Sequence, residues 1–166
     1  MSGICDDKIF LRVYIAYSKK LHHFLYYKTG NATNAEDLVQ DTFVRLWNNC
    51  DKVGLDKAKN YLFTIANNLF LDNVKHQKVR LKYKKVPQSK MTNQNPEYLL
   101  EEQEFKTRLE VAISQLPESQ RVVFLMNRID KMKYREIADV LNISVKAVEK
   151  RMHKALVKLR ALSSKI

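Results

Sequence analysis

Glycine and proline are scarce in this chain, and their scarcity limits what the chain can fold into. The 166 residues include only three glycines and three prolines, so sharp turns are few and long helices are expected. No segment of useful length alternates apolar and polar residues with the period of a strand. Hydrophobic residues make up 45% of the chain, which is enough to build a buried core. Together these features predict an all-α fold.

Apolar residues recur at three- and four-residue steps along most of the chain, a pattern typical of amphipathic helices. The clearest helix is 35–47, for which Asn34 is the predicted N-cap, with Glu36 and Asp37 in the first turn. Pro117 is expected in the first turn of a later helix. The full set of predicted helices is 9–27, 35–47, 59–80, 97–115, 118–129, 133–141 and 145–162.

A polar segment near the middle of the chain interrupts this pattern. Residues 84–95 read Lys-Lys-Val-Pro-Gln-Ser-Lys-Met-Thr-Asn-Gln-Asn and are followed by Pro96. The segment holds turn signals and few side chains suited to a core, which is typical of a linker. We therefore predict two small helical domains, residues 1–83 and 97–166, joined by a flexible linker at 84–96.

The charge of the chain favours a polyanionic partner. The formal net charge is +12, and the cations cluster in two regions. Residues 73–90 contain seven Lys or Arg and no acid, and residues 141–166 contain seven with only Glu149 as an acid. Residues 97–110 lie between these regions and include five Glu. Two basic regions separated by an acidic one indicate two contacts with nucleic acid.

The two cysteines, Cys5 and Cys50, show no paired spacing. The sequence therefore predicts neither a zinc site nor a disulfide framework, and a reducing compartment fits. The first residues lack the pattern of a signal peptide, and no apolar stretch approaches the length of a membrane span. Catalytic triads, paired carboxylates, metal-ligand clusters and glycine-rich phosphate loops are also lacking. We expect a cytoplasmic protein that is no enzyme, holds no metal or cofactor, and does not insert into a membrane.

The last fifty residues have the pattern of a helix-turn-helix. Residues 134–141 form a short amphipathic helix, residues 142–144 a tight turn, and Ser144 is a good N-cap for the helix that follows. The residues of that second helix expected to pack inward are Val145, Val148, Met152, Leu156 and Leu159. A basic helix that begins directly after a tight turn is how many proteins place side chains in the major groove of DNA.

The opposite face of this second helix is the predicted DNA contact. The residues expected to be exposed on this face, near the start of the helix, are Ser144, Lys146, Ala147, Glu149, Lys150, Arg151, His153 and Lys154. Long cationic side chains there can reach base edges and flanking phosphates, and Glu149 can accept from a cytosine amino group. The alternative interpretation is a solvated basic helix on a helical bundle, without a role in DNA binding.

Three stretches of the chain carry a resemblance to a known family. They are residues 34–47 (Asn-Ala-Glu-Asp-Leu-Val-Gln-Asp-Thr-Phe-Val-Arg-Leu-Trp), 59–72 (Lys-Asn-Tyr-Leu-Phe-Thr-Ile-Ala-Asn-Asn-Leu-Phe-Leu-Asp) and 116–125 (Leu-Pro-Glu-Ser-Gln-Arg-Val-Val-Phe-Leu). With the helix pair that follows the third, they resemble bacterial sigma factors of the extracytoplasmic-function (ECF) group. In that family the first stretch binds core RNA polymerase, the second melts and reads the minus-ten promoter element, and the third belongs to the domain that reads the minus-thirty-five element.

The resemblance implies roles for particular residues. It places Asp37, Gln40 and Asp41 against the coiled coil of the polymerase's largest subunit. It assigns the minus-ten element to Asp56, Lys57, Asn60, Tyr61, Asn68, Lys75 and Lys78. Tyr61 stands where the family usually has Trp, and Tyr61 and Phe63 have an alternative interpretation as core residues. The resemblance also implies regulation by an anti-sigma factor.

The favoured hypothesis is thus an ECF-type sigma factor that binds core RNA polymerase and directs promoter-specific initiation. One rival is a self-sufficient helix-turn-helix regulator, which would bind duplex DNA tightly without polymerase. Another is a helical adaptor that touches DNA only incidentally. Lys146 and Glu149 depart from residues common in the family, so the DNA sequence recognised does not follow from the resemblance.

Overall fold

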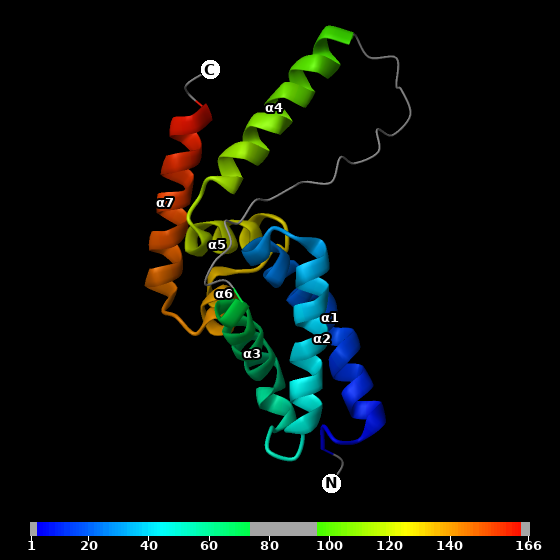
Figure 1. The fold of residues 1–166 in the computed structure, drawn as a ribbon. Helices are drawn as coiled ribbons and strands as arrows, with labels where there is room; N and C mark the ends of the chain where they lie inside the picture. The colour runs from blue at the N-terminus through cyan, green and yellow to red at the C-terminus, as the bar shows by residue number, and fades with distance from the viewer. Residues whose placement is uncertain (1–2, 74–95, 164–166) are drawn as a thin grey trace.

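The computed structural model describes residues 3–73 and 96–163, and the helices within these ranges confirm the all-α prediction (Figure 1). No strand is present in this part of the chain. The elements are α1 (Asp7–Thr29), α2 (Ala32–Asn48), the short 3₁₀-helix η1 (Leu55–Lys57), α3 (Ala58–Asn73), α4 (Pro96–Ser114), α5 (Glu118–Arg128), α6 (Tyr134–Leu141) and α7 (Val145–Ser163). Nearly all of the predicted linker, and the end predicted for the helix 59–80, lie outside the described residues.

Local capping sets the ends of the first two helices. The Asp6 carboxylate accepts hydrogen bonds from the backbone N–H groups of Lys8 and Ile9 at the start of α1. Gly30 ends that helix in the left-handed conformation, with φ of 67°, which glycine adopts without steric cost. Asn31 then caps α2 by accepting from the backbone N–H of Asn34. The prediction of Asn34 as the N-cap is therefore wrong: α2 begins earlier because Asn31 supplies both an extended backbone and the side-chain acceptor.

Helices α1, α2 and α3 form what we call the N-terminal bundle. Each helix runs antiparallel to the next, and short connections join them (Figure 1). Its fully buried side chains are mostly large and apolar, and include Leu21, Phe24, Leu25, Leu46, Leu62 and Phe70. Burying a side chain of this kind contributes ~1.5–3 kcal/mol, so the apolar stripes predicted from the sequence account for the packing of these helices.

Helices α4 to α7 form what we call the C-terminal bundle, and α6 and α7 are the predicted helix-turn-helix. The Ser144 hydroxyl accepts from the backbone N–H of Ala147 and caps α7, as predicted. Val148 and Met152 are buried as predicted, but Val145 is 39% exposed, so the inward face of α7 begins one turn later than expected. Pro117 is the N-cap of α5 and not part of its first turn.

The two bundles pack directly against each other. Helix α1 contacts α5, and α3 contacts α6, so buried residues of both bundles belong to one continuous cluster. The boundary between the two predicted domains remains a prediction, since the chain that connects the bundles lies outside the described residues. This packing nevertheless places α3, which carries part of the predicted minus-ten set, against α6 of the predicted helix-turn-helix.

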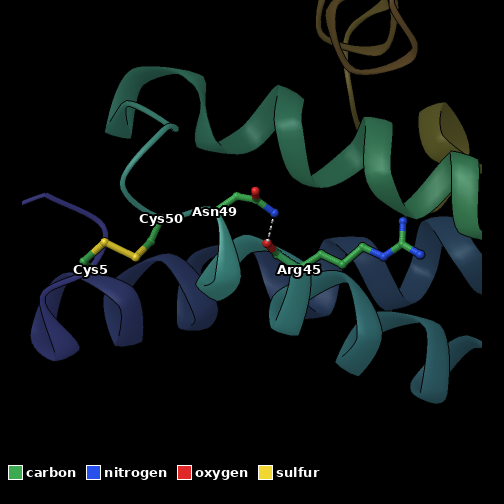
Figure 2. The surroundings of a disulfide bond; sticks show 4 residues. All are labelled: Cys5, Arg45, Asn49 and Cys50. Carbon is green, nitrogen blue, oxygen red and sulfur yellow. Dashed lines mark hydrogen bonds between the residues drawn. A yellow bond between two sulfur atoms is a disulfide. The ribbon is translucent and has the colours of Figure 1, made fainter.

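A disulfide joins Cys5 to Cys50, with 5.1 Å between their Cα atoms (Figure 2). The expectation of no disulfide is therefore wrong. Cys5 lies just before α1 and Cys50 just after α2. Because these helices are antiparallel neighbours, residues 45 positions apart in sequence become adjacent in space.

Candidate DNA and polymerase interfaces

Helix α7 presents most of its predicted DNA-facing residues to solvent. Ser144, Lys146, Glu149, Lys150, His153 and Lys154 are exposed, and Ala147 is half-buried. Val148, Met152 and Ala155 hold the opposite side of the helix in the core. The cationic side of α7 is thus exposed to solvent over most of its first three turns, as a helix that enters a major groove must be.

Arg151 differs from its neighbours on α7. It is half-buried and lines a cavity of about 290 Å³ between the bundles, together with Lys28, Asn67 and the end of α6. The helical wheel assigns Arg151 to the basic face, but in this arrangement it borders the N-terminal bundle. Only a contact between distant parts of the chain distinguishes it from Lys150.

Four of the predicted minus-ten residues lie at or just before the start of α3. Asp56 and Lys57 lie on η1, and Asn60 lies in the first turn of α3; all three are exposed. Asn68 is also exposed, two turns further along α3. Tyr61 is half-buried and packs against the core, whereas Phe63 is 2% exposed and belongs to the core. Lys75 and Lys78 lie outside the described residues.

Helix α2 has a sharply divided surface. Asp37, Gln40 and Asp41 are all exposed on one side, while Leu38, Val39, Phe43 and Leu46 are buried on the other. Val44 is 57% exposed within the polar side, a feature that the sequence pattern did not single out. Trp47 is 43% exposed, and its ring lies edge-to-face against Phe10 with 5.0 Å between centroids. The helix therefore offers a mixed acidic, amide and apolar face to a partner.

Comparison with known protein families identifies the family of the chain that carries these surfaces. A family model described as "Sigma-70 region 2" matches residues 13–80, and one described as "Sigma-70, region 4" matches residues 106–159. The chain belongs to the sigma-70 family. Its relatives place it in the ECF group, and as a sigma factor of this group it binds RNA polymerase and acts in promoter-specific transcription initiation.

Individual relatives agree with this assignment. The sigma factor is 28% identical to the ECF RNA polymerase sigma factor SigW of Bacillus subtilis, over 93% of this chain and 89% of SigW. It is 31% identical to the RNA polymerase sigma factor NccH of Alcaligenes xylosoxydans xylosoxydans, over 78% of this chain and 73% of NccH. It spans only 57% of the longer ECF sigma factor SigE of Mycolicibacterium smegmatis, at 27% identity over 87% of this chain.

A solved structure shares the fold over nearly the whole chain. The structure of CnrH in complex with the cytosolic domain of CnrY matches with a TM-score of 0.66 and 26% identity, over 96% of this chain and 90% of CnrH. No helix within residues 3–73 and 96–163 of this sigma factor is long and apolar enough to cross a membrane.

A buried lysine joins the two bundles of the sigma factor. Lys28 is 6% exposed, and its ammonium donates to Asn67 Oδ1 at 2.6 Å and to Glu118 Oε1 at 2.7 Å. It also lies over the rings of Phe24 and Phe70, 5.0 Å from each centroid. Burial lowers the pKa of Lys28, and the hydrogen bond that its ammonium donates to Glu118 opposes that shift only in part. Glu118 is the first residue of α5, so this ion pair spans the two bundles.

A buried arginine caps the end of α1 from the other bundle. Arg121 is 3% exposed, and its guanidinium donates to the backbone oxygens of Tyr27 at 2.9 Å and Lys28 at 3.4 Å. These are among the last carbonyls of α1, which lack partners within the helix and attract cations. Another nitrogen of the same guanidinium donates to Leu116 O at 3.1 Å. Arg121 therefore ties the start of the C-terminal bundle to the end of α1.

Asp130 adds a third polar link. Its carboxylate accepts from the Tyr27 hydroxyl at 2.9 Å and lies 2.7 Å from His23 Nδ1. We refer to Lys28, Glu118, Arg121, His23, Tyr27 and Asp130 as the interbundle clamp. Sequence reasoning missed all of it. The one available signal was the presence of Lys28 and Arg121 within apolar helical stripes, where charged residues are rarely buried without a partner.

Proposed function

We propose that this sigma factor divides promoter-specific initiation among three surfaces on three separate elements. Helix α2 contacts core polymerase, η1 with α3 opens and reads the minus-ten element, and α7 reads the minus-thirty-five element. The observation that supports this most strongly is that each predicted residue set among the described residues is largely exposed, while the opposite side of its helix is buried. The surfaces can therefore act without unfolding the bundles that carry them.

The polymerase contact rests on the polar side of α2. Asp37, Gln40 and Asp41 provide two carboxylates and an amide, which suit basic and polar groups on a partner helix. Val44 lies among them and provides the exposed apolar surface that the centre of a protein interface needs. A partner that packs on Val44 and makes polar contacts around it would bury this face without disturbing the core.

The minus-ten contact rests on amides and an aromatic ring beside cations. Capturing unstacked bases requires flat surfaces for stacking and hydrogen-bonding groups for the exposed base edges. Asn60 and Asn68 provide exposed amides, and Lys57 provides a cation for the backbone. Tyr61 is half-buried, so part of its side chain stays available to a base while the remainder packs on the bundle.

The minus-thirty-five contact rests on the first turns of α7. Ser144 fixes the start of the helix, so Lys146 and Lys150 project from its exposed side at neighbouring turns. Such cations bind phosphates and guanine edges, and Glu149 between them can accept from cytosine. The sigma factor performs no catalysis of its own in this account, since the polymerase supplies the chemistry. We place it in the cytoplasm with the polymerase.

Promoter binding requires the bundles to separate. The names of the two elements imply centres about 25 base pairs apart, which is roughly 85 Å at 3.4 Å per step. Helix α3 contacts α6, which leads directly into α7, and α3 and α7 are only about 24 Å and 29 Å long at 1.5 Å per residue. The packed form described here cannot reach both elements, so we assign it to the sigma factor free of DNA.

An anti-sigma factor that binds the packed form would keep it inactive. CnrH, which has the same fold, is known in complex with another protein.

Retention on purified core polymerase tests the division of labour. The double variant Gln40→Ala, Asp41→Ala should lose retention on core polymerase. Lys150→Ala should be retained normally but should use the minus-thirty-five element less well. Glu101→Ala and Lys158→Ala remove exposed charges from α4 and from the far end of α7, and serve as matched controls.

The possible outcomes separate this proposal from its rivals. If the α2 and α7 variants show the same defect, the assignment to separate surfaces is wrong. A specific footprint on duplex DNA without polymerase, combined with no retention of the unmodified protein on core, would instead indicate a self-sufficient regulator.

A further inference from the structure

The disulfide lies at a junction of two capped helix ends. Cys5 immediately precedes Asp6, the N-cap of α1, and Cys50 immediately follows Asn49, the C-cap of α2. Figure 2 shows the Asn49 side chain turned back to donate to Arg45 O, at 2.9 Å, beside the disulfide. The backbone N–H of Cys50 donates to Trp47 O at 3.3 Å. Both cysteines therefore have positions set by the capping of their helices, so they meet whenever α1 and α2 pack.

The pair is chemically accessible and unique in the chain. Cys5 is exposed and Cys50 is half-buried, so the disulfide joins two residues at the surface of the protein. The chain contains no other cysteine, so no internal thiol can compete for either sulfur. Exposed disulfides are the ones that exchange readily with external thiols.

The disulfide restrains the segment that leads to the predicted minus-ten residues. Only five residues separate Cys50 from Asp56, and Lys52 N–H donates to Asn49 O at 3.0 Å at the start of this stretch. On the other side of the bond, Ile4 is fully buried and anchors the N-terminal residues to the bundle. The segment 51–57, which includes η1 and which we call the loop 51–57, is thus tied through the residue before it, Cys50, to an anchored segment.

We propose that Cys5 and Cys50 form a reversible redox switch that controls the order of loop 51–57, and through it the capture of the minus-ten element. The oxidised form holds the loop in one arrangement, so binding of unpaired bases costs less entropy. The reduced form leaves the loop freer and weakens that capture. This inference rests on the proposed role of the loop in reading the minus-ten element.

The chemical step is thiol–disulfide exchange. A dithiol reductant attacks one sulfur through its thiolate, breaks the Cys5–Cys50 bond and forms a mixed disulfide. The cysteine that was not attacked leaves in this step, and the second thiol of the reductant then attacks the mixed disulfide, closes the reductant's own disulfide and releases the first cysteine. Two electrons and two protons pass from the dithiol to the protein, which ends with two thiols. A low-molecular-weight disulfide oxidant reverses the reaction.

The first arm of the test uses no DNA. Hydrogen exchange is measured on the full chain, oxidised with glutathione disulfide or reduced with dithiothreitol. Reduction should speed exchange of the loop 51–57 by about five-fold or more, while α7 should not change. Cys5→Ser and Cys50→Ser should each give the fast rate under both conditions, because either one prevents the bond. Equal loop exchange in the two redox states would overturn the proposal.

The second arm measures open-complex formation with core polymerase on a promoter that the sigma factor uses. The oxidised protein should form several-fold more open complex than the reduced protein, and both serine variants should match the reduced protein in both conditions. If initiation occurs equally in both redox states, the switch is refuted and the proposed function stands. If no initiation occurs in either state, the proposed function fails, and the exchange arm still decides whether the disulfide controls the loop.

Discussion

The ion pair between Lys28 and Glu118 gives a quantitative test of the packing between the bundles. In the Glu118→Ala variant, the side-chain amide of Asn67 remains as the hydrogen-bond acceptor for the buried ammonium of Lys28. Losing a hydrogen bond between charged groups costs about 1.5–3 kcal/mol, and breaking a fully buried pair costs more. The Glu118 side chain is 38% exposed, so water screens part of the interaction. We therefore expect Glu118→Ala to lower the free energy of unfolding by ~1–2 kcal/mol.

A double-mutant cycle isolates this interaction from other effects of each change. Once Lys28→Met has removed the ammonium, Glu118→Ala should cost less than ~0.5 kcal/mol, which gives a coupling energy of about 1–2 kcal/mol. The free energies come from urea unfolding of the four proteins followed by circular dichroism.

An exposed ion pair elsewhere in the chain provides the control for this cycle. Arg108 and Glu104 lie one turn apart on α4, 3.4 Å from each other and both exposed. The same cycle on this pair should give no more than about 0.5 kcal/mol. A Lys28–Glu118 coupling as small as that of the control would refute the reasoning, because it would mean that the bundles do not pack in this way in solution.

The remaining predictions concern pH, the disulfide and salt. Burial lowers the pKa of Lys28, so between that pKa and about 10.4 the unfolded chain binds more protons than the folded chain. The free energy of unfolding should therefore receive a contribution from Lys28 that rises as the pH increases toward about 10.4, and Lys28→Met should remove that contribution. Under oxidising conditions Cys50→Ser should lower the free energy of unfolding by up to about 4 kcal/mol, the loop-entropy value for a separation of 45 residues, and a reductant should abolish the difference. Lys150→Ala should reduce by about one the slope of log affinity for promoter DNA against log salt concentration, whereas Lys158→Ala should leave the slope unchanged. The first expectation is contradicted if Lys28→Met leaves the pH dependence of the unfolding free energy unaltered. The second is contradicted if Cys50→Ser is still destabilising in reductant, and the third if the two lysine variants have equal salt slopes.

The features predictable from the sequence are those set by neighbouring residues. Helical periodicity and the Ser144 cap depend on contacts within one or two turns, so the order of the helices and the helix-turn-helix were predicted correctly. The choice between Asn31 and Asn34 as the N-cap of α2 could not be made from neighbouring residues. Both carry the same capping chemistry three residues apart, and only the backbone conformation after Gly30 selects Asn31.

The features that could not be predicted depend on contacts between distant parts of the chain. The partners of Lys28 and Arg121 include residues about 90 or more positions away along the chain. Periodicity gives the face of a helix but not its neighbour, so Arg151 was grouped with the exposed Lys150 although it borders the cavity between the bundles. The pairing of Cys5 with Cys50 similarly follows from the antiparallel packing of α1 on α2. Lys75 and Lys78 lie outside the described residues, and their predicted contact with DNA remains a prediction.

Run-off transcription shows whether this protein directs initiation at particular promoters. Purified core polymerase is supplied with fragments of the source genome, with and without this sigma factor, and the transcripts are mapped. We expect new, discrete start sites that appear only when the protein is added and that share sequence elements near minus ten and minus thirty-five. An unchanged set of transcripts, from a protein shown to be folded and bound to core polymerase, would contradict it.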